Sequence, residues 1–183
     1  VFDFEKQLVF YGSYHSHRIN VLCHVVCVPL ILWTAFVMTS PSGPIMTVES
    51  ELLAKLPIVL NVPFFVSLLY ASYYLTLEPI AGFLMTPVLI GMAATATTFY
   101  ETADHPIQTA FALHAFAWVA QIFTHQVFEK RSPALLDNLF QALALAPLFV
   151  FLEVLFFFGY RPALKKRFQN EVGINVTKFR RER

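Results

Sequence analysis

The sequence has few charged residues: 14% of it is charged, whereas 57% is hydrophobic. A soluble domain of this size normally has about a quarter charged residues. The charges that exist are mostly near the two ends, so the long central stretches offer no water-soluble face and would aggregate if exposed. The scarcity of charge therefore argues against an ordinary soluble domain and predicts a chain whose solvent is lipid.

Cysteine is equally scarce, with two residues in the chain. Cys23 and Cys27 are four positions apart within an apolar run. Buried thiols in such a run usually behave as small, inert hydrophobic side chains. We expect neither a disulfide nor a thiolate metal site from this pair.

Long apolar runs are abundant. A helix needs about 20 apolar residues to cross the hydrocarbon core of a bilayer, and candidate segments occur at 19–39, 56–77, 79–100, 106–128 and 139–160. The first connection contains Pro41, Gly43 and Pro44, which break helices and mark a surface loop. The second and third segments are separated by so few residues that we expect a tight antiparallel hairpin.

Pro63 and Pro87 lie inside the second and third segments, respectively. A proline inside a helix removes a backbone donor and kinks the helix unless neighbouring groups compensate. We therefore expect one of the two segments to be irregular or re-entrant. The predicted fold is an all-α integral membrane helical bundle of four to five hydrophobic segments, with four full spans and one irregular segment.

The two ends of the chain differ from its centre. Phe4, Leu8 and Tyr11 recur at near-helical spacing, which predicts an N-terminal amphipathic helix at the membrane interface. The division we expect is a membrane-embedded domain over 1–162 and a basic tail over 163–183. The tail should be cytoplasmic by the positive-inside rule, partly disordered, and attracted to anionic membrane lipids. No basic fold with interleaved aromatic residues accompanies it, so we expect no nucleic acid partner.

Histidine is concentrated at the apolar segments. All six histidines lie within or beside the first and fourth segments: His15, His17, His24, His105, His114 and His125. Asn20 and His24 are four positions apart and so share one helix face. An ionisable residue at membrane depth indicates a functional site by default, although a single histidine is more often a helix-to-helix hydrogen bond worth about 0.6 kcal/mol.

The fourth segment carries a polar stripe whose members recur every three or four residues: His114, Trp118, Gln121, His125 and Glu129. Unpaired polar groups in hydrocarbon cost several kcal/mol, so the stripe must face protein, a cavity or a metal. His114 and His125 are 11 positions apart, or about 16 Å along a straight helix. Either the helix is broken, or the two histidines serve two metals, or one of them has another role.

The whole set of polar residues predicts a metal or catalytic site. Neutral imidazole, carboxylate and amide side chains suit iron, zinc or copper, and residue types do not separate these metals. His17 and His105 lie at segment edges and are the expected bystanders. For Glu129, the sequence is equally compatible with an orienting role and with a place in a solvated loop. For Glu153, it is equally compatible with a functional role and with a structural hydrogen bond.

These residues also form an ordered set of motifs. Phe10-Tyr11-Gly12-Ser13-Tyr14-His15 is followed by Asn20 and His24 near a proline, and then by His114, Trp118, Gln121, His125, Glu129, Pro133-Ala134-Leu135 and Ala146-Pro147. From about residue 4 to residue 162, the chain resembles the fungal endoplasmic-reticulum 2-hydroxy fatty acid dioxygenase family, which degrades phytosphingosine to odd-chain fatty acids.

The resemblance implies an Fe(II)-dependent α-oxidation, in which dioxygen converts a long-chain 2-hydroxy fatty acid into a fatty acid one carbon shorter and carbon dioxide. It also implies a multi-pass enzyme of the endoplasmic reticulum membrane. The histidines proposed for the iron in that family correspond to His15, His24, His114 and His125. Beside them, Asn20, Gln121 and Glu129 are expected to orient the imidazoles by hydrogen bonds.

Two other classes of protein fit parts of the pattern. A b-type cytochrome would hold haem between histidines of facing helices, for which His24 and His125 are chemically suitable. A transporter or membrane scaffold would suit the proline-interrupted segments. The HxxxH and HxxHH spacings of membrane hydroxylases and desaturases are absent from the sequence.

Overall fold

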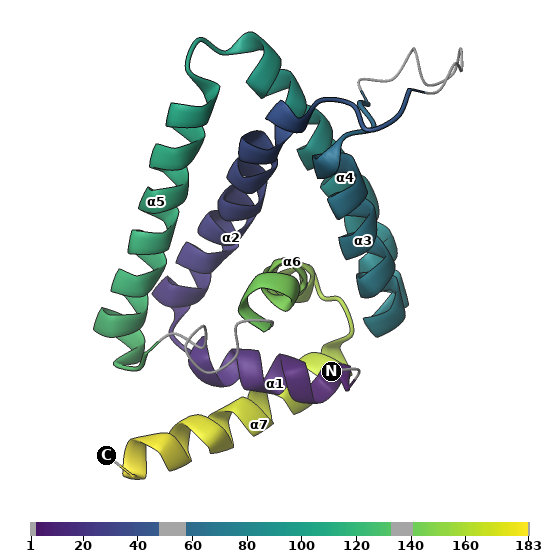
Figure 1. The fold of residues 1–183 in the computed structure, drawn as a ribbon. Coiled ribbons are helices and arrows are strands. Elements are labelled where there is room, and N and C mark those ends of the chain that lie inside the picture. Colours follow the sequence, from purple (N-terminus) through teal and green to yellow (C-terminus); the bar gives the residue numbers. More distant parts are fainter. Residues whose placement is uncertain (1–2, 48–57, 133–140, 183) are drawn as a thin grey trace. The chain divides into compact units, whose positions relative to one another are not determined.

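A computed structural model describes residues 3–47, 58–132 and 141–182 of the chain (Figure 1). Every regular element in these residues is helical, and the one β-bridge joins Pro44 to Asn61. The chain divides into two compact units, Val1–Val28 with Trp118–Arg183 and Pro29–Ala117. The helices α2 (Arg18–Thr39) and α5 (Pro106–Thr124) each contribute to both units.

Within residues 3–47, 58–132 and 141–182, three helices are long and apolar enough to cross a membrane: Arg18–Ser42, Pro79–Thr102 and Pro106–Glu129. Large apolar side chains on them point away from the protein, such as Leu22, Phe83 and Phe111, which are 66%, 71% and 67% exposed. In water such surfaces would aggregate, whereas hydrocarbon solvates them. The structure thus confirms the predicted all-α membrane helical bundle.

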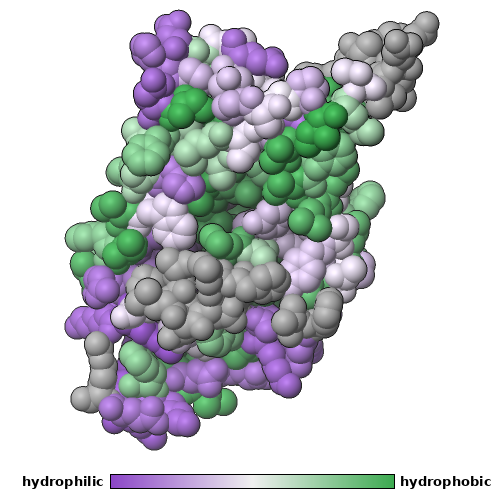
Figure 2. Space-filling view, viewed as in Figure 1, coloured by the Kyte–Doolittle hydropathy of each residue, from purple (hydrophilic) through white to green (hydrophobic). Residues whose placement is uncertain are grey.

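In the unit 29–117, α3 (Val62–Leu77) packs against α4 (Pro79–Thr102) as the predicted hairpin. Glu78 closes α3 through its backbone N–H and opens α4 through its carboxylate, which accepts a hydrogen bond from the Ala81 N–H at 2.6 Å. A Cβ at Gly82 would lie 2.6 Å from backbone atoms of Tyr74 and Leu75, so the close approach requires glycine. Figure 2 shows apolar side chains over much of this hairpin.

The prolines of the hairpin do not act as expected. Pro63 lies in the first turn of α3, where a missing N–H costs nothing, so it starts the helix rather than kinking it. Pro87 lies inside α4, which continues through it as one helix of 24 residues. With 16 residues, α3 is shorter than a typical span. Part of the predicted segment 56–77 falls outside the described residues.

The clearest break is in the last hydrophobic segment. A π-helical turn, η5 (Gln141–Leu145), leads into α6 (Ala146–Phe157). The apolar helix Leu143–Phe157 and α7 (Pro162–Arg181) then meet at an angle of 118°, as either a broken span or a re-entrant loop. At this bend Arg161 has a positive φ of 42°. The sequence did not predict this bend between α6 and α7, since it placed the irregular segment at the second or third apolar run.

At the chain ends, α1 (Phe4–Tyr14) confirms the predicted N-terminal helix, whereas the expectation of a partly disordered tail is wrong. Side by side in Figure 1, α7 packs against α1 through an apolar stripe that includes Leu164 and Phe168. A Cβ at Gly12 would overlap the side chain of Phe168, so glycine allows the two helices to touch. Hydrophilic side chains gather along α7 in Figure 2.

Candidate metal centre

Three histidines from three helical segments meet in the unit formed by 1–28 and 118–183. His15 follows α1 as its C-cap, His24 lies in α2, and His125 opens a π-helical turn, η3 (His125–Glu129), after α5. Their ring centroids are 4.4 Å (His15–His24), 4.8 Å (His15–His125) and 4.9 Å (His24–His125) apart. Each ring offers a nitrogen, and the three nitrogens lie within 4.8 Å of one another.

Backbone carbonyls fix the tautomers of two of these rings. The Nδ1 of His15 donates a hydrogen bond to the Tyr11 carbonyl at 2.7 Å, and the Nδ1 of His24 donates one to the Asn20 carbonyl at 2.9 Å. A carbonyl oxygen can only accept, so both Nδ1 atoms carry the proton. Each Nε2 therefore keeps its lone pair, as a metal ligand requires.

The third histidine has an unsatisfied atom. His125 is 2% exposed, and its buried Nδ1 has no hydrogen-bond partner in the described part of the chain. Buried polar atoms without a partner are rare in native structures and often indicate a missing ion or ligand. Nitrogen ligands bound at about 2.1 Å to a shared metal lie roughly 3 to 4 Å apart, so a small inward movement of these rings would hold one ion. The residues present fit a metal.

Burial keeps the His15 ring neutral. The pKa of His15, which lies outside the membrane-spanning helices, is well below its usual value of 6.5, because burial disfavours the charged ring and His24 and His125 lie beside it. A neutral imidazole is the form that binds metals. His15 is thus prepared for coordination at neutral pH.

Glu129 ties the segments of the cluster together. Its Oε1 accepts hydrogen bonds from the backbone N–H groups of Ser16 and His17, both at 2.7 Å, and from Asn20 Nδ2 at 3.1 Å. Its Oε2 accepts from the Ser16 hydroxyl at 2.8 Å. The carboxylate at the end of η3 therefore holds the junction between His15 and His24.

Asn20 completes this connection from within α2. It is fully buried, and its side-chain oxygen accepts a hydrogen bond from the Thr124 hydroxyl at 2.8 Å, directly before His125. The Thr124 hydroxyl also lies 3.0 Å from the carbonyl of Gln121, which is 6% exposed. Asn20 thus orients His24 through its main chain and contacts the end of α5 through its side chain.

His114 is not among the histidines that the structure gathers. It lies in the unit 29–117, where its Nδ1 is 2.8 Å from the Thr34 hydroxyl. His17, an expected bystander, accepts a hydrogen bond from the Ile19 N–H at 3.2 Å and stacks on Phe128. Cys23 and Cys27 are free thiols with sulfur atoms 3.8 Å apart. The metal roles of the four predicted histidines stay predictions.

Sequence reasoning missed Tyr11, whose ring stacks on the His15 ring with centroids 4.0 Å apart and planes at 16°. Burial, with Glu153 and Glu129 nearby, raises the pKa of its hydroxyl well above 10, so the hydroxyl keeps its proton. The signal was available, because Tyr11 precedes His15 by four residues on a helix. Thr124 was missed too, although it directly precedes His125.

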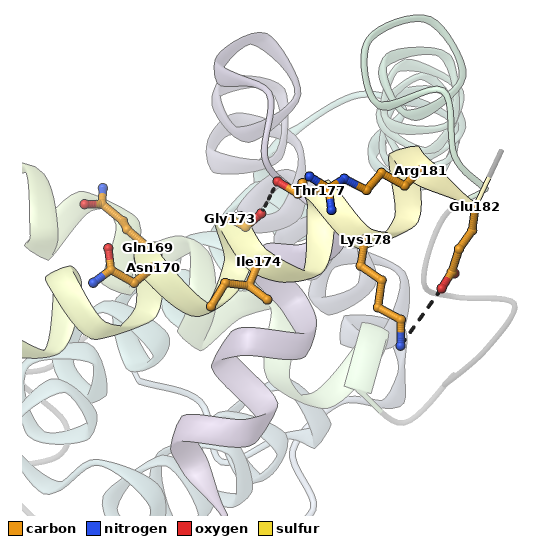
Figure 3. Close-up of a pocket in the computed structure, with 8 residues that line it drawn as sticks. All are labelled: Gln169, Asn170, Gly173, Ile174, Thr177, Lys178, Arg181 and Glu182. Atoms are coloured by element: carbon orange, nitrogen blue, oxygen red, sulfur yellow. Dashed lines mark hydrogen bonds and ion pairs between the residues drawn. The ribbon is translucent and has the colours of Figure 1, made fainter.

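A separate surface hollow of about 710 Å³ is lined by eight residues of α7 and its C-cap, between Gln169 and Glu182 (Figure 3). Lys178 and Glu182 pair across it at 4.0 Å. The Thr177 hydroxyl, a second polar group of its lining, donates to the Gly173 carbonyl at 2.7 Å. None of the three clustered histidines lines it, so the hollow is distinct from the candidate metal centre.

Comparison with known proteins gives a specific result. A family model described as 2-hydroxy-palmitic acid dioxygenase Mpo1-like matches residues 1–158. A relative in Saccharomyces cerevisiae, named 2-hydroxy-palmitic acid dioxygenase MPO1, is 35% identical over 185 residues, which cover 99% of this chain and 96% of that protein. No solved structure matches the chain significantly.

Proposed function

The chain belongs to the Mpo1-like family, and we propose from this premise that it is a membrane-embedded dioxygenase acting on long-chain 2-hydroxy fatty acids. The observation that supports the chemistry is the cluster of three buried histidines. The proposed reaction is an α-oxidation: R–CH(OH)–COOH and O₂ give R–COOH, CO₂ and H₂O. The bond between the carboxyl carbon and the hydroxyl-bearing carbon breaks, and dioxygen is reduced.

We propose Fe(II) as the metal and His15, His24 and His125 as its ligands. Bound iron would supply open coordination positions for dioxygen and for the oxygens of the substrate, which neutral imidazoles leave available. His114, a candidate from the sequence, is not part of this cluster, and its Nδ1 lies 2.8 Å from the Thr34 hydroxyl. We therefore expect it to play a role other than binding this metal.

The protein's own residues then position and shield the reaction. Backbone carbonyls hold His15 and His24 with Nε2 available, while Glu129, Asn20 and Thr124 connect the segments that carry the three rings. Gln121 stays a predicted orienting residue. The rings themselves are 8%, 5% and 2% exposed, so bulk water is largely excluded. Apolar helix surfaces are a suitable environment for the acyl chain.

The test combines metal analysis with an oxygen-uptake assay. Protein purified without air and reconstituted with Fe(II) should bind iron, consume oxygen with 2-hydroxypalmitate and release pentadecanoate and carbon dioxide. Palmitate, which lacks the 2-hydroxyl group, is the matched control and should not be consumed. Protein that binds iron but leaves 2-hydroxypalmitate unchanged would contradict the proposed activity, and full activity with zinc alone would contradict the proposed metal.

The cytochrome alternative is not favoured, because three imidazole rings in mutual contact leave little space for a planar haem between two of them. An absorption spectrum without a Soret band would exclude it. A transporter or scaffold would consume no oxygen with 2-hydroxy acids.

We also propose that the protein resides in the endoplasmic reticulum membrane, contacts its lipids and serves phytosphingosine degradation. The basic residues Lys178, Arg180 and Arg181 in the last turn of α7 support a cytoplasmic location for this helix. A reporter fused after Arg183 should be reached by cytosolic protease in sealed microsomes. Protection from the protease would contradict this orientation.

A further inference from the structure

Beside the candidate metal centre, the hydroxyl of Tyr11 has no hydrogen-bond partner among the residues that the structure describes. Tyr11 is 4% exposed, and its buried hydroxyl forms no hydrogen bond with any described residue. Buried tyrosine hydroxyls usually find a partner, and leaving one unsatisfied costs about 1–3 kcal/mol. A phenylalanine would place the same ring at this position, so packing alone does not explain the tyrosine oxygen.

The surroundings of Tyr11 place it at the metal centre rather than in a remote core. Its ring lies parallel to the His15 ring, and its carbonyl fixes the His15 tautomer. Phe149 of α6 also lies beside the Tyr11 ring, with centroids 5.1 Å apart. The hydroxyl is therefore held on a rigid stack between a proposed ligand and an apolar helix.

The Nδ1 of His125 is the second buried atom without a partner in this cluster of aromatic rings. Two unsatisfied polar atoms, both on residues that contact His15, indicate that a polar group from outside the protein belongs there. A metal accounts for the histidine nitrogen, whereas a neutral tyrosine hydroxyl is not among the usual nitrogen, sulfur and carboxylate ligands of such metals. The hydroxyl is instead a hydrogen-bond donor.

We propose that Tyr11 is a substrate-binding residue whose hydroxyl donates a hydrogen bond to the carboxylate of the fatty acid. This inference rests on the proposed function. A long-chain acid carries its polar atoms at one end, and its carboxylate is the stronger acceptor there, since hydrogen bonds to charged oxygens are about twice as strong as those to neutral ones. Tyr11 would fix the head of the acid beside the metal while the chain extends among apolar side chains.

The experiment compares Tyr11→Phe with Tyr14→Phe. Tyr14 is also buried on α1, but its ring stacks under the guanidinium group of Arg131 at 3.4 Å, so it serves as the matched control. Dissociation constants are measured without oxygen in detergent for palmitate, 2-hydroxypalmitate and hexadecanol. Iron content and the thermal midpoint report whether the ring stack and the fold are retained.

We expect Tyr11→Phe to keep its iron and to bind palmitate and 2-hydroxypalmitate about tenfold more weakly. Its affinity for hexadecanol, which has no carboxylate, should match that of the unmodified protein, and Tyr14→Phe should bind all three compounds normally. Unchanged palmitate affinity in Tyr11→Phe would overturn the proposal and indicate a structural water at the hydroxyl. Weakening limited to 2-hydroxypalmitate would move the contact to the 2-hydroxyl group and overturn the carboxylate assignment.

The two proposals fail in distinguishable ways. If the unmodified protein binds these acids but oxidises none of them, the proposed activity fails while the binding role of Tyr11 is still measured. If the unmodified protein oxidises 2-hydroxypalmitate and Tyr11→Phe shows the same KM, kcat and palmitate affinity, the role of Tyr11 alone is overturned.

Discussion

His15 and His24 are oriented in the same way, although they are held by different helices. Each ring donates a hydrogen bond from Nδ1 to the carbonyl of the residue four positions earlier. A helix places residues four apart on one face, so the tautomer of each ring follows from local geometry. The face shared by Asn20 and His24 was predictable from spacing alone.

We predict that His24→Ala lowers bound iron by about tenfold or more, because it removes one of the three proposed ligands. His105→Ala, an exposed histidine, is the control and should retain all iron. His114→Ala should also retain it. Elemental analysis of the purified variants provides the measurement, with circular dichroism to verify helicity. Normal iron in His24→Ala would exclude His24 as a ligand.

The protonation of His15 gives a second prediction. Its folded pKa is below 6.5, so below that pH the unfolded chain binds a proton that the folded protein does not. Metal-free protein should therefore lose stability as the pH falls below 6.5 towards the folded pKa, by about 1 kcal/mol per pH unit for one such group. Thermal midpoints at pH 7.5 and 5.5 measure the effect. Replacement by His15→Gln should reduce the difference, and an unchanged difference would contradict the assignment.

At the scale of the elements, the cluster depends on contacts between segments that are far apart in the sequence. Glu129 reaches Ser16 and His17 across 113 and 112 positions. Its carboxylate lies at the start of α2, where the helix dipole also favours a negative charge. The sequence predicted an orienting role for Glu129 but not this route through the backbone, because one sequence does not show which distant segments meet.

We predict that Glu129→Gln weakens iron binding by about 10- to 100-fold, as substitutions behind metal ligands commonly do. The amide replaces an acceptor with a donor that faces other donors. Glu101→Gln, at an exposed position near the end of α4, is the control for the charge change and should bind iron normally. Metal titration under anaerobic conditions distinguishes them. Equal affinities in both variants would exclude a positioning role for Glu129.

The α3–α4 hairpin allows a test that does not involve the metal. Gly82→Ala brings a Cβ within 2.6 Å of backbone atoms of Tyr74 and Leu75, and we expect a destabilisation of about 1–3 kcal/mol. Gly91→Ala, on the same helix, meets nothing within 4 Å and should be neutral or slightly stabilising. Thermal unfolding in detergent compares the two. Similar midpoints would show that the hairpin is looser than described.

At the scale of the whole molecule, hydropathy was sufficient for most of the fold. The predicted segments 19–39, 79–100 and 106–128 correspond closely to α2, α4 and α5 with η3, because a bilayer demands long apolar helices. The helical state of α7 was not predicted. The apolar stripe of α7 includes Leu164 and Phe168, and it stabilises the helix by packing on other helices. The polar composition of the segment gave no indication of this packing.

The sequence predicted the residues of the candidate site in part, because residue type is visible in a sequence whereas spatial neighbours are not. Residue types identified His15, His24 and His125, since polar groups in an apolar helix need a partner. Sequence spacing left three alternatives for His114, and none of them could be chosen without knowing its neighbour. In the structure that neighbour is Thr34, a residue that no motif singled out.

We predict that the protein behaves as an integral membrane protein. The exposed apolar surfaces of α2, α4 and α5 should keep it in the membrane pellet after washing at pH 11, a treatment that releases peripheral proteins. Detergent should be required to extract it. Release of the intact chain into the alkaline wash would contradict the membrane-spanning helices.

The position of the histidines along their helices has a consequence for where the acid is handled. His24 is six residues after the start of α2, and His125 is four residues before the end of the span Pro106–Glu129, about 9 Å and 6 Å from those ends at 1.5 Å per residue. A carboxylate is costly at the bilayer midplane but well solvated near the headgroups. The carboxylate of a fatty acid within one leaflet would therefore lie at about the same depth as the proposed metal. Shortening of the chain would then require neither extraction of the acid into water nor its transfer across the bilayer.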